Sequence, residues 1–263
     1  QMCIRDSDYS KINKDEEMQS YIRCKIKDGW SPQVIAGRWN LQNNHINISH
    51  ESIYSWIYSD SMKKEKLFLH LPLRKKKRGR FIRKSIKNNV DKKLINIRPE
   101  EVNNRSRIGD WEIDLVFQQG NQSANFLTAI DRKTRFAQII KNESKKSDDI
   151  ALVVQRLQSE YDIKTITTDN GTEFSKYSEF KVDTYFCNPG SPWQKGAIEH
   201  FNGMIRRKID YRTPMNSIDQ KSIDKVVENL NNMPRKILGF LTPKEAINQS
   251  RVKLAQPAIE ALQ

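Results

Sequence analysis

Hydrophobic and polar residues alternate along one short stretch of the chain, from residue 110 to residue 117. Alternation at every second position is the pattern of a β-strand with one buried face. Four apolar side chains share one face: Trp111, Ile113, Leu115 and Phe117. Asp110, Glu112 and Asp114 share the other. The stretch therefore predicts a strand that packs on a core with one side and presents acids on the other.

The patterns that follow predict an α/β domain with a mixed sheet. Two more strands, over 125–131 and 135–141, would form an antiparallel meander with the first. A helix over 147–161, capped by Ser147, is expected next, followed by a strand from 164 that stops at Asp169. A short helix over 175–180, a strand over 184–188 and a helix from Ser191 to Lys208 come after it. The chain is expected to end with a helix over 217–231, a short helix after Thr242 and a loose tail from Arg251.

The N-terminal part has the pattern of a small all-α domain. An amphipathic helix is expected from Glu17, a second helix begins with Ser31 as cap and Pro32 in its first turn, and a third begins after Ser49. Two short helices across a turn form a helix-turn-helix, in which the outer residues at the start of the second helix contact base edges. The residues in that position are His50, Glu51, Tyr54 and Ser55. A helical subdomain without a DNA role is the alternative, because short helix pairs are common.

Charge points to a polyanionic partner. The chain has 263 residues, a formal net charge of +14 and an isoelectric point near 9.6. Nine of the fourteen residues from Arg74 to Lys87 are cationic and none is acidic. The first six cations of this run are Arg74, Lys75, Lys76, Lys77, Arg78 and Arg80. Such a run favours an extended linker that contacts DNA phosphates, with a purely solubilising linker or an anionic membrane surface as alternatives.

Several protein classes do not fit the sequence. No apolar run is long enough to span a bilayer and no secretory signal is recognisable, so we expect a cytoplasmic, nucleoid-associated bacterial protein. The three cysteines, Cys3, Cys24 and Cys187, lack paired spacing, which fits a reducing compartment. The four histidines show no zinc-ligand spacing, so no structural zinc is expected.

Three acids far apart in the sequence are candidates for one metal site. Asp114 lies within the first strand, Asp169 ends another strand at an Asn-Gly turn, and Glu199 lies on the helix that begins near Ser191. Carboxylates are the ligands that Mg²⁺ prefers, and such a site is typical of phosphoryl transfer. Asp110 and Glu112 remain competitors for the role of Asp114. Asn202 and Arg206, near Glu199 on the same helix, are expected to orient Glu199 or to contact a phosphate. Trp193, Gln194 and Lys195 are expected to stack on or grip a DNA end.

The segments around these acids resemble the DDE transposases of bacterial insertion sequences, in particular the family named for insertion sequence thirty. The resemblance rests on Gly109–Asp114, Thr168–Gly171 with Glu173 and Phe174, Ser191–Gly196, Glu199 with Asn202 and Gly203, and Leu230–Glu245. It implies a ribonuclease-H-like integrase core over 99–247, preceded by the helix-turn-helix region over 1–70 and the basic linker over 71–98, with a tail over 248–263.

The resemblance also implies an activity and its requirements. Asp114, Asp169 and Glu199 would be the catalytic, metal-holding acids for two Mg²⁺ ions, for which Mn²⁺ can substitute. The protein would cleave and transfer DNA strands at the terminal inverted repeats of its element, with transposon ends and target DNA as partners and with a homo-oligomer assembled on the DNA. A structure-selective nuclease on the same fold is a further alternative, against which the helix-turn-helix argues.

Two departures from the family pattern leave a second function open. Asp169 and Glu199 are separated by 29 residues, fewer than is usual in the family. The chain begins at Gln1 without the first helix-turn-helix of family members, so it reads as N-terminally incomplete. The alternative function is therefore a catalytically impaired, truncated transposase that acts as a DNA-binding repressor.

Overall fold

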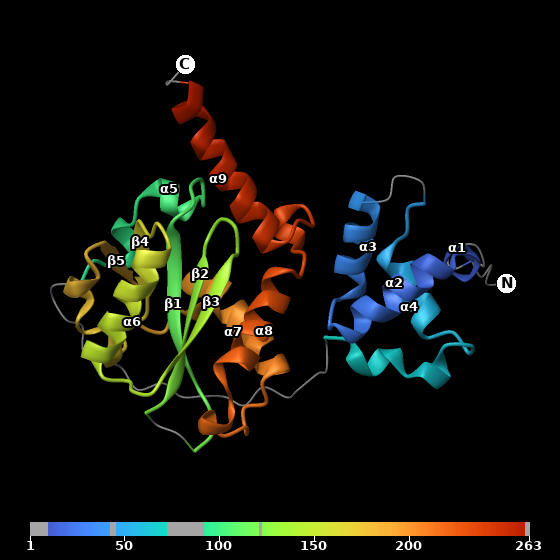
Figure 1. The fold of residues 1–263 in the computed structure, drawn as a ribbon, viewed down its shortest axis with the longest axis horizontal. Coiled ribbons are helices and arrows are strands. Elements are labelled where there is room, and N and C mark those ends of the chain that lie inside the picture. The colour runs from blue at the N-terminus through green and yellow to red at the C-terminus, as the bar shows by residue number, and fades with distance from the viewer. Residues whose placement is uncertain (1–9, 43–45, 73–91, 121–122, 261–263) are drawn as a thin grey trace. The chain divides into compact units, whose positions relative to one another are not determined.

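The computed structural model describes residues 10–42, 46–72, 92–120 and 123–260. Two compact units make up the chain, the first comprising residues 1–80 and 233–242 and the second residues 81–232 and 243–263. Figure 1 shows the helices of the first unit and the sheet of the second. Within the described ranges, no helix combines the length and hydrophobicity needed to cross a lipid bilayer.

The first unit is helical, as predicted. Its helices are α1 (Ser10–Lys14), α2 (Glu16–Lys27), α3 (Pro32–Gln42) and α4 (His50–Ile57), followed by short 3₁₀ turns at Lys63–Glu65 and Leu67–His70. The core of this unit is formed by the buried faces of α2, α3 and α4, including Met18, Ile22, Ile35, Trp39, Ile53 and Trp56.

Local signals in the sequence set the ends of α3 and α4. The Ser49 hydroxyl accepts a hydrogen bond from the Ser52 amide at 3.0 Å, which satisfies one of the unpaired N–H groups at the start of α4. The Asn40 side chain bonds both the amide and the carbonyl of Ile48 at 2.9 Å. These contacts hold the two helices together across the turn, so the expected helix pair is present.

The second unit is built on a five-stranded mixed sheet. Its strands are β1 (Asp110–Phe117), β2 (Asn125–Asp131), β3 (Ala137–Asn142), β4 (Thr165–Thr168) and β5 (Asp183–Phe186). The order across the sheet is β3-β2-β1-β4-β5. The first three strands are antiparallel, and β4 and β5 run parallel to β1. This is the ribonuclease-H-like arrangement that the sequence predicts, meander included.

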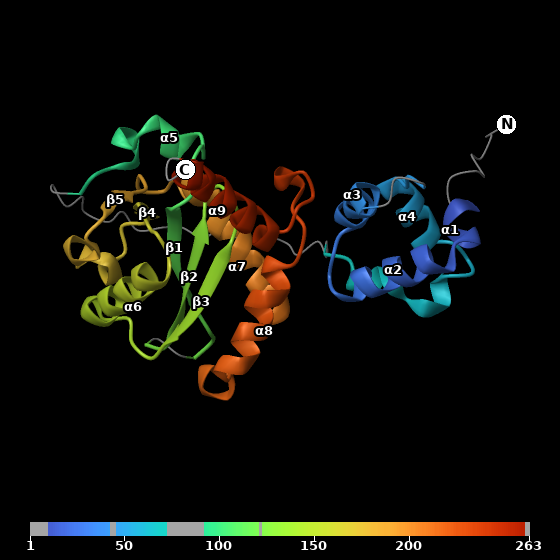
Figure 2. The same cartoon turned by 45° about the horizontal axis from the view of Figure 1, so that its top comes forward.

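Helices cover both faces of this sheet, as Figure 2 shows. Helix α6 (Ser147–Glu160) packs on the apolar face of β1, where Trp111, Ile113 and Leu115 meet Ile150 and Val154 in one buried cluster. The acid-bearing face of β1 is covered by α7 (Gly196–Lys208), and α8 (Gln220–Asn231) packs against β3. A short helix, α5 (Glu100–Asn103), precedes β1. The acids of β1 therefore lie between the sheet and α7.

Several element boundaries differ from the sequence-based expectation. Ser147 is the first residue of α6, and Lys146 takes the cap position without a side-chain bond. The helix expected over 175–180 is a 3₁₀ turn at Tyr177–Phe180, preceded by another at Thr172–Phe174. The helix from Ser191 begins as a 3₁₀ turn (Pro192–Lys195) and becomes regular only at Gly196. Helix α8 starts after Asp219, whose carboxylate accepts from the Ser222 amide.

The last helix of the chain is longer than predicted. In place of a short helix with a tail from Arg251, a single helix, α9, runs from Pro243 to Glu260. Pro243 stands at its first position, where the missing amide hydrogen costs nothing. Hydrophobic periodicity, on which the prediction relied, does not extend to the end of this helix.

Candidate active site

The register of β1 against β4 sets two of the predicted acids side by side. Glu112 pairs with Thr167 in this parallel ladder. Continuing the register by two residues brings Asp169, which follows the last residue of β4, level with Asp114. Because side chains alternate between the faces of a sheet, both aspartates lie on the face that α7 covers.

Lys195 joins the two aspartates. Its Nζ lies 3.0 Å from Asp114 Oδ1 and 2.9 Å from Asp169 Oδ2. The lysine side chain is only 8% exposed, whereas that of Asp169 is 44% exposed. Solvent therefore reaches the site at Asp169 but is largely excluded from Lys195. The second oxygen of Asp169 accepts from the Gly171 amide at 3.0 Å, which fixes the carboxylate in the Asn-Gly turn.

Burial and charge act in opposite directions on this group of three. Burial raises the pKa of Asp114, the ammonium group of Lys195 opposes that rise, and the charge of Asp169 adds to it. Burial alone would lower the pKa of Lys195, but the two carboxylates raise it above its ordinary value. Lys195 is therefore a firmly protonated cation whose charge compensates two neighbouring carboxylates.

Asn202 completes the surroundings of Asp114 from helix α7. Its Nδ2 donates to Asp114 Oδ2 at 2.9 Å, so both oxygens of Asp114 are engaged. The amide oxygen of Asn202 is buried and has no hydrogen-bond partner among the described residues. A buried acceptor without a partner next to paired carboxylates is suited to a hydrated cation, so these oxygen atoms fit a hard divalent metal.

The two competing acids of β1 are engaged elsewhere. Asp110 is fully buried, accepts from the Thr165 hydroxyl at 2.8 Å and pairs with Arg107 at 3.1 Å. Glu112 is also buried; one of its oxygens accepts from Arg132 and the other from the Ile198 amide at 2.9 Å. Both carboxylates hold the fold together, Glu112 by tying the start of α7 to the sheet. This distribution favours Asp114 over either acid as a metal ligand.

Three further predicted site residues lie on or before α7 and are exposed: Glu199, Arg206 and Trp193. Among the described residues, no group of three His, Cys, Asp or Glu side chains is arranged to hold a metal ion. The structure thus brings Asp114, Asp169, Lys195 and Asn202 together. The participation of Glu199, in the first turn of the same helix, stays a prediction.

One acid near the site was missed as a candidate, although it belongs to a segment that carries the resemblance. Glu173 follows Asp169 by four residues. Burial raises the pKa of Glu173, and the charges of Asp169 and Asp114 add to the rise. Gly171 allows this approach, because a Cβ atom there would lie 2.4 Å from the Glu173 carboxyl carbon. The only signal in the sequence was an acid one turn beyond a candidate ligand.

The predicted DNA-contacting residues of the first unit lie on α4. His50, Glu51 and Ser55 are exposed and Tyr54 is half-buried, so all four can be reached from outside. His50 Nε2 lies 3.2 Å from Glu51 Oε1. The cationic residues from Arg74 to Arg80 fall outside the described residues.

Comparison with known proteins gives several transposases of insertion sequences. The chain is 38% identical over 220 residues to the transposase for insertion sequence element IS4351 of Bacteroides fragilis, covering 78% of this chain and 65% of that protein. It is 33% identical over 235 residues to transposase InsI for element IS30A of Escherichia coli, covering 82% and 60%. It is 31% identical over 234 residues to the transposase for element IS1086 of Cupriavidus metallidurans, covering 82% and 68%.

Two other comparisons add less. No protein-family model matches the chain. Among solved structures, the catalytic core domain of BIV integrase is similar at a TM-score of 0.44 and 16% identity, covering 56% of this chain and 98% of that one. The fold assignment rests on the strand order and not on this likeness.

Each alignment covers a larger share of this chain than of the relative. About four fifths of this chain is matched, but the chain spans only about two thirds or less of the length of the relatives first matched. A match of 82% of the chain must include its middle, where β1, β4 and the start of α7 carry the three predicted acids. By sequence similarity over most of its length, the chain belongs to the family of insertion-sequence transposases that includes those of IS30A and IS1086.

Proposed function

We propose that the protein is a DNA transposase that cleaves and transfers strands at the terminal inverted repeats of an insertion sequence. The observation that carries the proposal is the pairing of Asp114 and Asp169 beside helix α7. Two carboxylates side by side on one face of the sheet, with a buried cation between them, provide hard oxygen ligands of the kind that Mg²⁺ binds. Membership in the transposase family supplies the reaction class.

In this proposal, Asp114, Asp169 and Glu199 hold the divalent metal, with Mg²⁺ as the expected ion, two per site, and Mn²⁺ as a substitute. When bound, such ions stabilise the charge that develops on phosphate oxygens during strand cleavage. The remaining roles belong to the protein. Lys195 holds both aspartates in place through hydrogen bonds from its ammonium group, and Asn202 fixes the orientation of Asp114 through its amide group.

Binding of DNA would be divided between the two units. His50, Glu51, Tyr54 and Ser55 are proposed to contact the repeat sequence from α4, since they occupy the outer face at the start of a second helix. The cationic run after residue 73 would contact phosphates without reading sequence. The division into a helix-turn-helix region, a linker and a catalytic domain is part of this proposal, as is a homo-oligomer that pairs two DNA ends.

One assay tests the proposal. The chain is incubated with a duplex ending in the inverted repeat of its own element, with a scrambled duplex and with a branched duplex, each in Mg²⁺, Mn²⁺ or EDTA. Metal-dependent nicking at the repeat end alone supports the transposase. Repeat-specific binding without nicking in either metal would contradict it in favour of the repressor, and cutting of branched DNA regardless of sequence would indicate a nuclease.

A further inference from the structure

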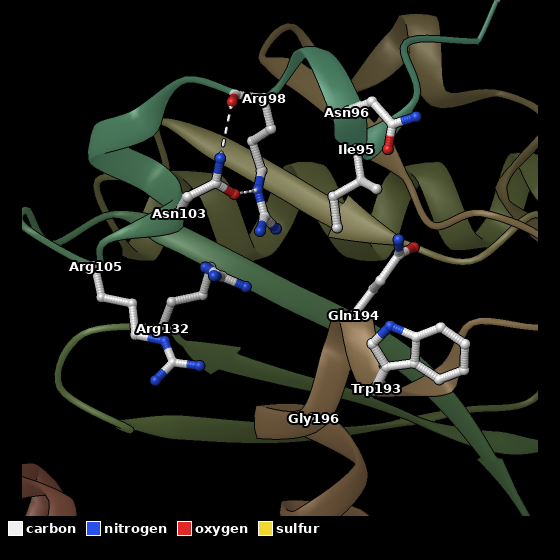
Figure 3. A pocket seen from close by; sticks show the side chains of 9 residues that line it. All are labelled: Ile95, Asn96, Arg98, Asn103, Arg105, Arg132, Trp193, Gln194 and Gly196. Atoms are coloured by element: carbon white, nitrogen blue, oxygen red, sulfur yellow. Dashed lines mark hydrogen bonds between the residues drawn. The ribbon is translucent and has the colours of Figure 1, made fainter.

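A pocket of about 380 Å³ lies beside the start of α7 in the second unit. Three arginines line it: Arg98 before α5, Arg105 after α5 and Arg132 after β2. Figure 3 shows these side chains on one side of the pocket and Trp193 and Gln194 on the other. The volume lies in the range of small-molecule sites. Such a concentration of guanidinium groups opposite an indole ring indicates a site for an anion with a flat group attached.

Arg98 is buried among neutral hydrogen-bond partners. It is 8% exposed, and it donates to the Asn103 amide oxygen at 2.8 Å and to the Thr167 hydroxyl at 3.1 Å. Burial, together with the charge of Arg132, lowers the pKa of Arg98 to about 10. A guanidinium group in this setting is stabilised by an added anion.

One carboxylate compensates the neighbouring arginines. Arg132 forms an ion pair with Glu112 and donates a hydrogen bond to the Val102 carbonyl. Among the described residues, no salt bridge joins Arg98 or Arg105 to a carboxylate. Burial lowers the pKa of Arg132, Glu112 opposes the change, and Arg105 adds to it. Because Glu112 also accepts from the Ile198 amide, its charge is shared between α7 and the arginines. The pocket thus carries an excess of positive charge.

Arg105 supplies an unused donor. Its Nε is buried and has no hydrogen-bond partner within the described part of the chain. The backbone at Arg105 has a φ of 56°, in the left-handed region that arginine seldom adopts. A buried donor without an acceptor is costly unless a ligand satisfies it. Arg105 as a whole is half-buried and lines the pocket, so the exposed part of its side chain can be reached by a group that enters the pocket.

Trp193 gives the pocket a flat aromatic wall that is open to solvent. Its side chain is 73% exposed, whereas Trp30, Trp39, Trp56 and Trp111 are each 7% exposed or less. An exposed indole next to cationic groups is the usual platform for a nucleobase. Trp193 and Gln194 directly precede Lys195, which holds Asp114 and Asp169. The pocket and the candidate active site therefore share one turn of the chain.

We propose that this pocket binds a phosphodiester group of an unpaired DNA strand through Arg98 and Arg105, with the adjacent base stacked on Trp193. The proposal rests on the proposed function, and it assigns the strand a place next to the paired aspartates. Guanidinium groups match phosphate oxygens in geometry and charge, and base stacking is tolerant of sequence. The pocket therefore grips a strand end or a melted nucleotide without selecting its sequence.

The test uses the whole chain in EDTA, so that binding is measured without strand cleavage. The variants are Arg105→Gln and Trp193→Ala, which change a donor without a partner and an exposed ring and so leave the core intact. The controls are Arg156→Gln and Leu152→Ala, exposed residues of α6 on the opposite face of the sheet. The probes are a short thymidine oligonucleotide, an abasic strand of equal length, thymidine monophosphate and inorganic phosphate.

The expected results separate the two parts of the pocket. Trp193→Ala weakens binding of the thymidine strand roughly tenfold but leaves binding of the abasic strand unchanged. Arg105→Gln weakens binding of both strands and reduces the dependence of log K on log salt by about 0.7, the value for one phosphate contact on a single strand. The thymidine strand also protects Trp193 from acrylamide quenching, whereas both controls behave as the wild type.

Three results would overturn the proposal. The first is that both variants bind the strands as tightly as the controls do, and the second is that the wild type binds abasic and thymidine strands equally. The third is full protection of Trp193 by thymidine monophosphate, which would indicate that the pocket binds a free nucleotide. Failure here is distinct from failure of the proposed function. If the protein nicks repeat ends but Arg105→Gln and Trp193→Ala leave strand binding unchanged, the pocket proposal fails and the proposed function stands. If both substitutions weaken strand binding but the protein does not nick repeat ends, the proposed function fails and the pocket proposal stands.

Discussion

The ammonium group of Lys195 lies 2.9 Å from Asp169 Oδ2, although the two residues come from different elements and one of them was expected to contact DNA. The same ammonium lies 3.0 Å from Asp114 Oδ1. Without it, two carboxylates would face each other in a partly buried site, where like charges repel strongly. Lys195 therefore has a role in holding the acids before any DNA arrives.

Replacing this lysine should cost stability in a pH-dependent way. We expect Lys195→Met to lower the free energy of unfolding at pH 7 by about 2 kcal/mol, less than for a fully buried pair because Asp169 is partly exposed. The pKa of Asp114, already raised, should rise further, so the variant loses stability as pH rises through that pKa. The deficit should shrink towards pH 4, as measured by urea unfolding.

The matched control is Lys176→Met. Lys176 also bridges two carboxylates, Asp148 at 3.1 Å and Glu179 at 3.4 Å, but its side chain is 46% exposed. Solvent screens such a pair, so this variant should unfold like the wild type. Equal losses for the two lysine variants, or a Lys195→Met deficit that does not change with pH, would contradict the assigned role.

Gly109 is a second position at which a small change should have a large effect. Its φ is +97°, and a Cβ atom would lie 2.7 Å from the backbone oxygen of Asp162. Its amide donates to Asp131 Oδ2 at 2.9 Å and its carbonyl accepts from the Lys164 amide at 2.8 Å, so it sets where β1 begins. Gly109→Ala should destabilise the protein by about 3 kcal/mol in urea unfolding.

A glycine with a similar backbone but open surroundings isolates the effect of the collision. Gly120 has a φ of +78°, and a Cβ atom there would meet no atom of the described residues within 4 Å. Gly120→Ala should therefore cost only about 1 kcal/mol, from backbone strain alone. A Gly109→Ala loss no greater than that of Gly120→Ala would show that the contact with Asp162 does not constrain the chain.

The cysteines should differ in reactivity. Cys187 is 4% exposed, and burial raises its pKa to about 11, so at pH 8 only about one thiol in a thousand is ionised. Cys24 is exposed. Iodoacetamide at pH 8 should modify Cys24 and spare Cys187 in the folded protein, whereas both should react in urea. Mass spectrometry of the digested protein measures this, and equal labelling in the native state would be inconsistent with the buried site.

The sequence was sufficient to predict the local elements around the site. Alternation in 110–117 predicted both the strand and the face on which Asp114 lies, and the start signals at Ser31, Pro32 and Ser49 predicted the helix pair. These features depend on neighbours a few residues away, so a local pattern carries them. The strand order followed from the same patterns together with the resemblance.

Other parts of the site depend on contacts between distant residues. The register that sets Asp169 beside Asp114 is a parallel pairing, which no short stretch specifies. Glu112 and Asp114 share one face of β1 and differ only in which groups α7 and Arg132 offer them. The arginine pocket likewise combines residues from three separate parts of the chain, and α9 extends beyond the predicted helix without a hydrophobic periodicity that marks its end.

Substitution of each acid tests whether Asp114, Asp169 and Glu199 act together in strand cleavage. Asp114→Asn, Asp169→Asn and Glu199→Gln should each reduce Mg²⁺-dependent cleavage of the repeat-ended duplex by more than about 100-fold, beyond the usual loss for a residue that only supports a metal ligand. Binding of the same duplex in a gel-shift assay should persist. Asp183→Asn is the control, since this exposed acid begins β5 at the opposite end of the sheet.

The most direct measurement is therefore the cleavage rate of these four variants against the wild type on one duplex, with duplex binding measured in parallel. We expect cleavage to be lost in the first three variants and kept in Asp183→Asn, with binding intact throughout. Cleavage at the wild-type rate by Asp114→Asn, Asp169→Asn or Glu199→Gln would contradict this expectation.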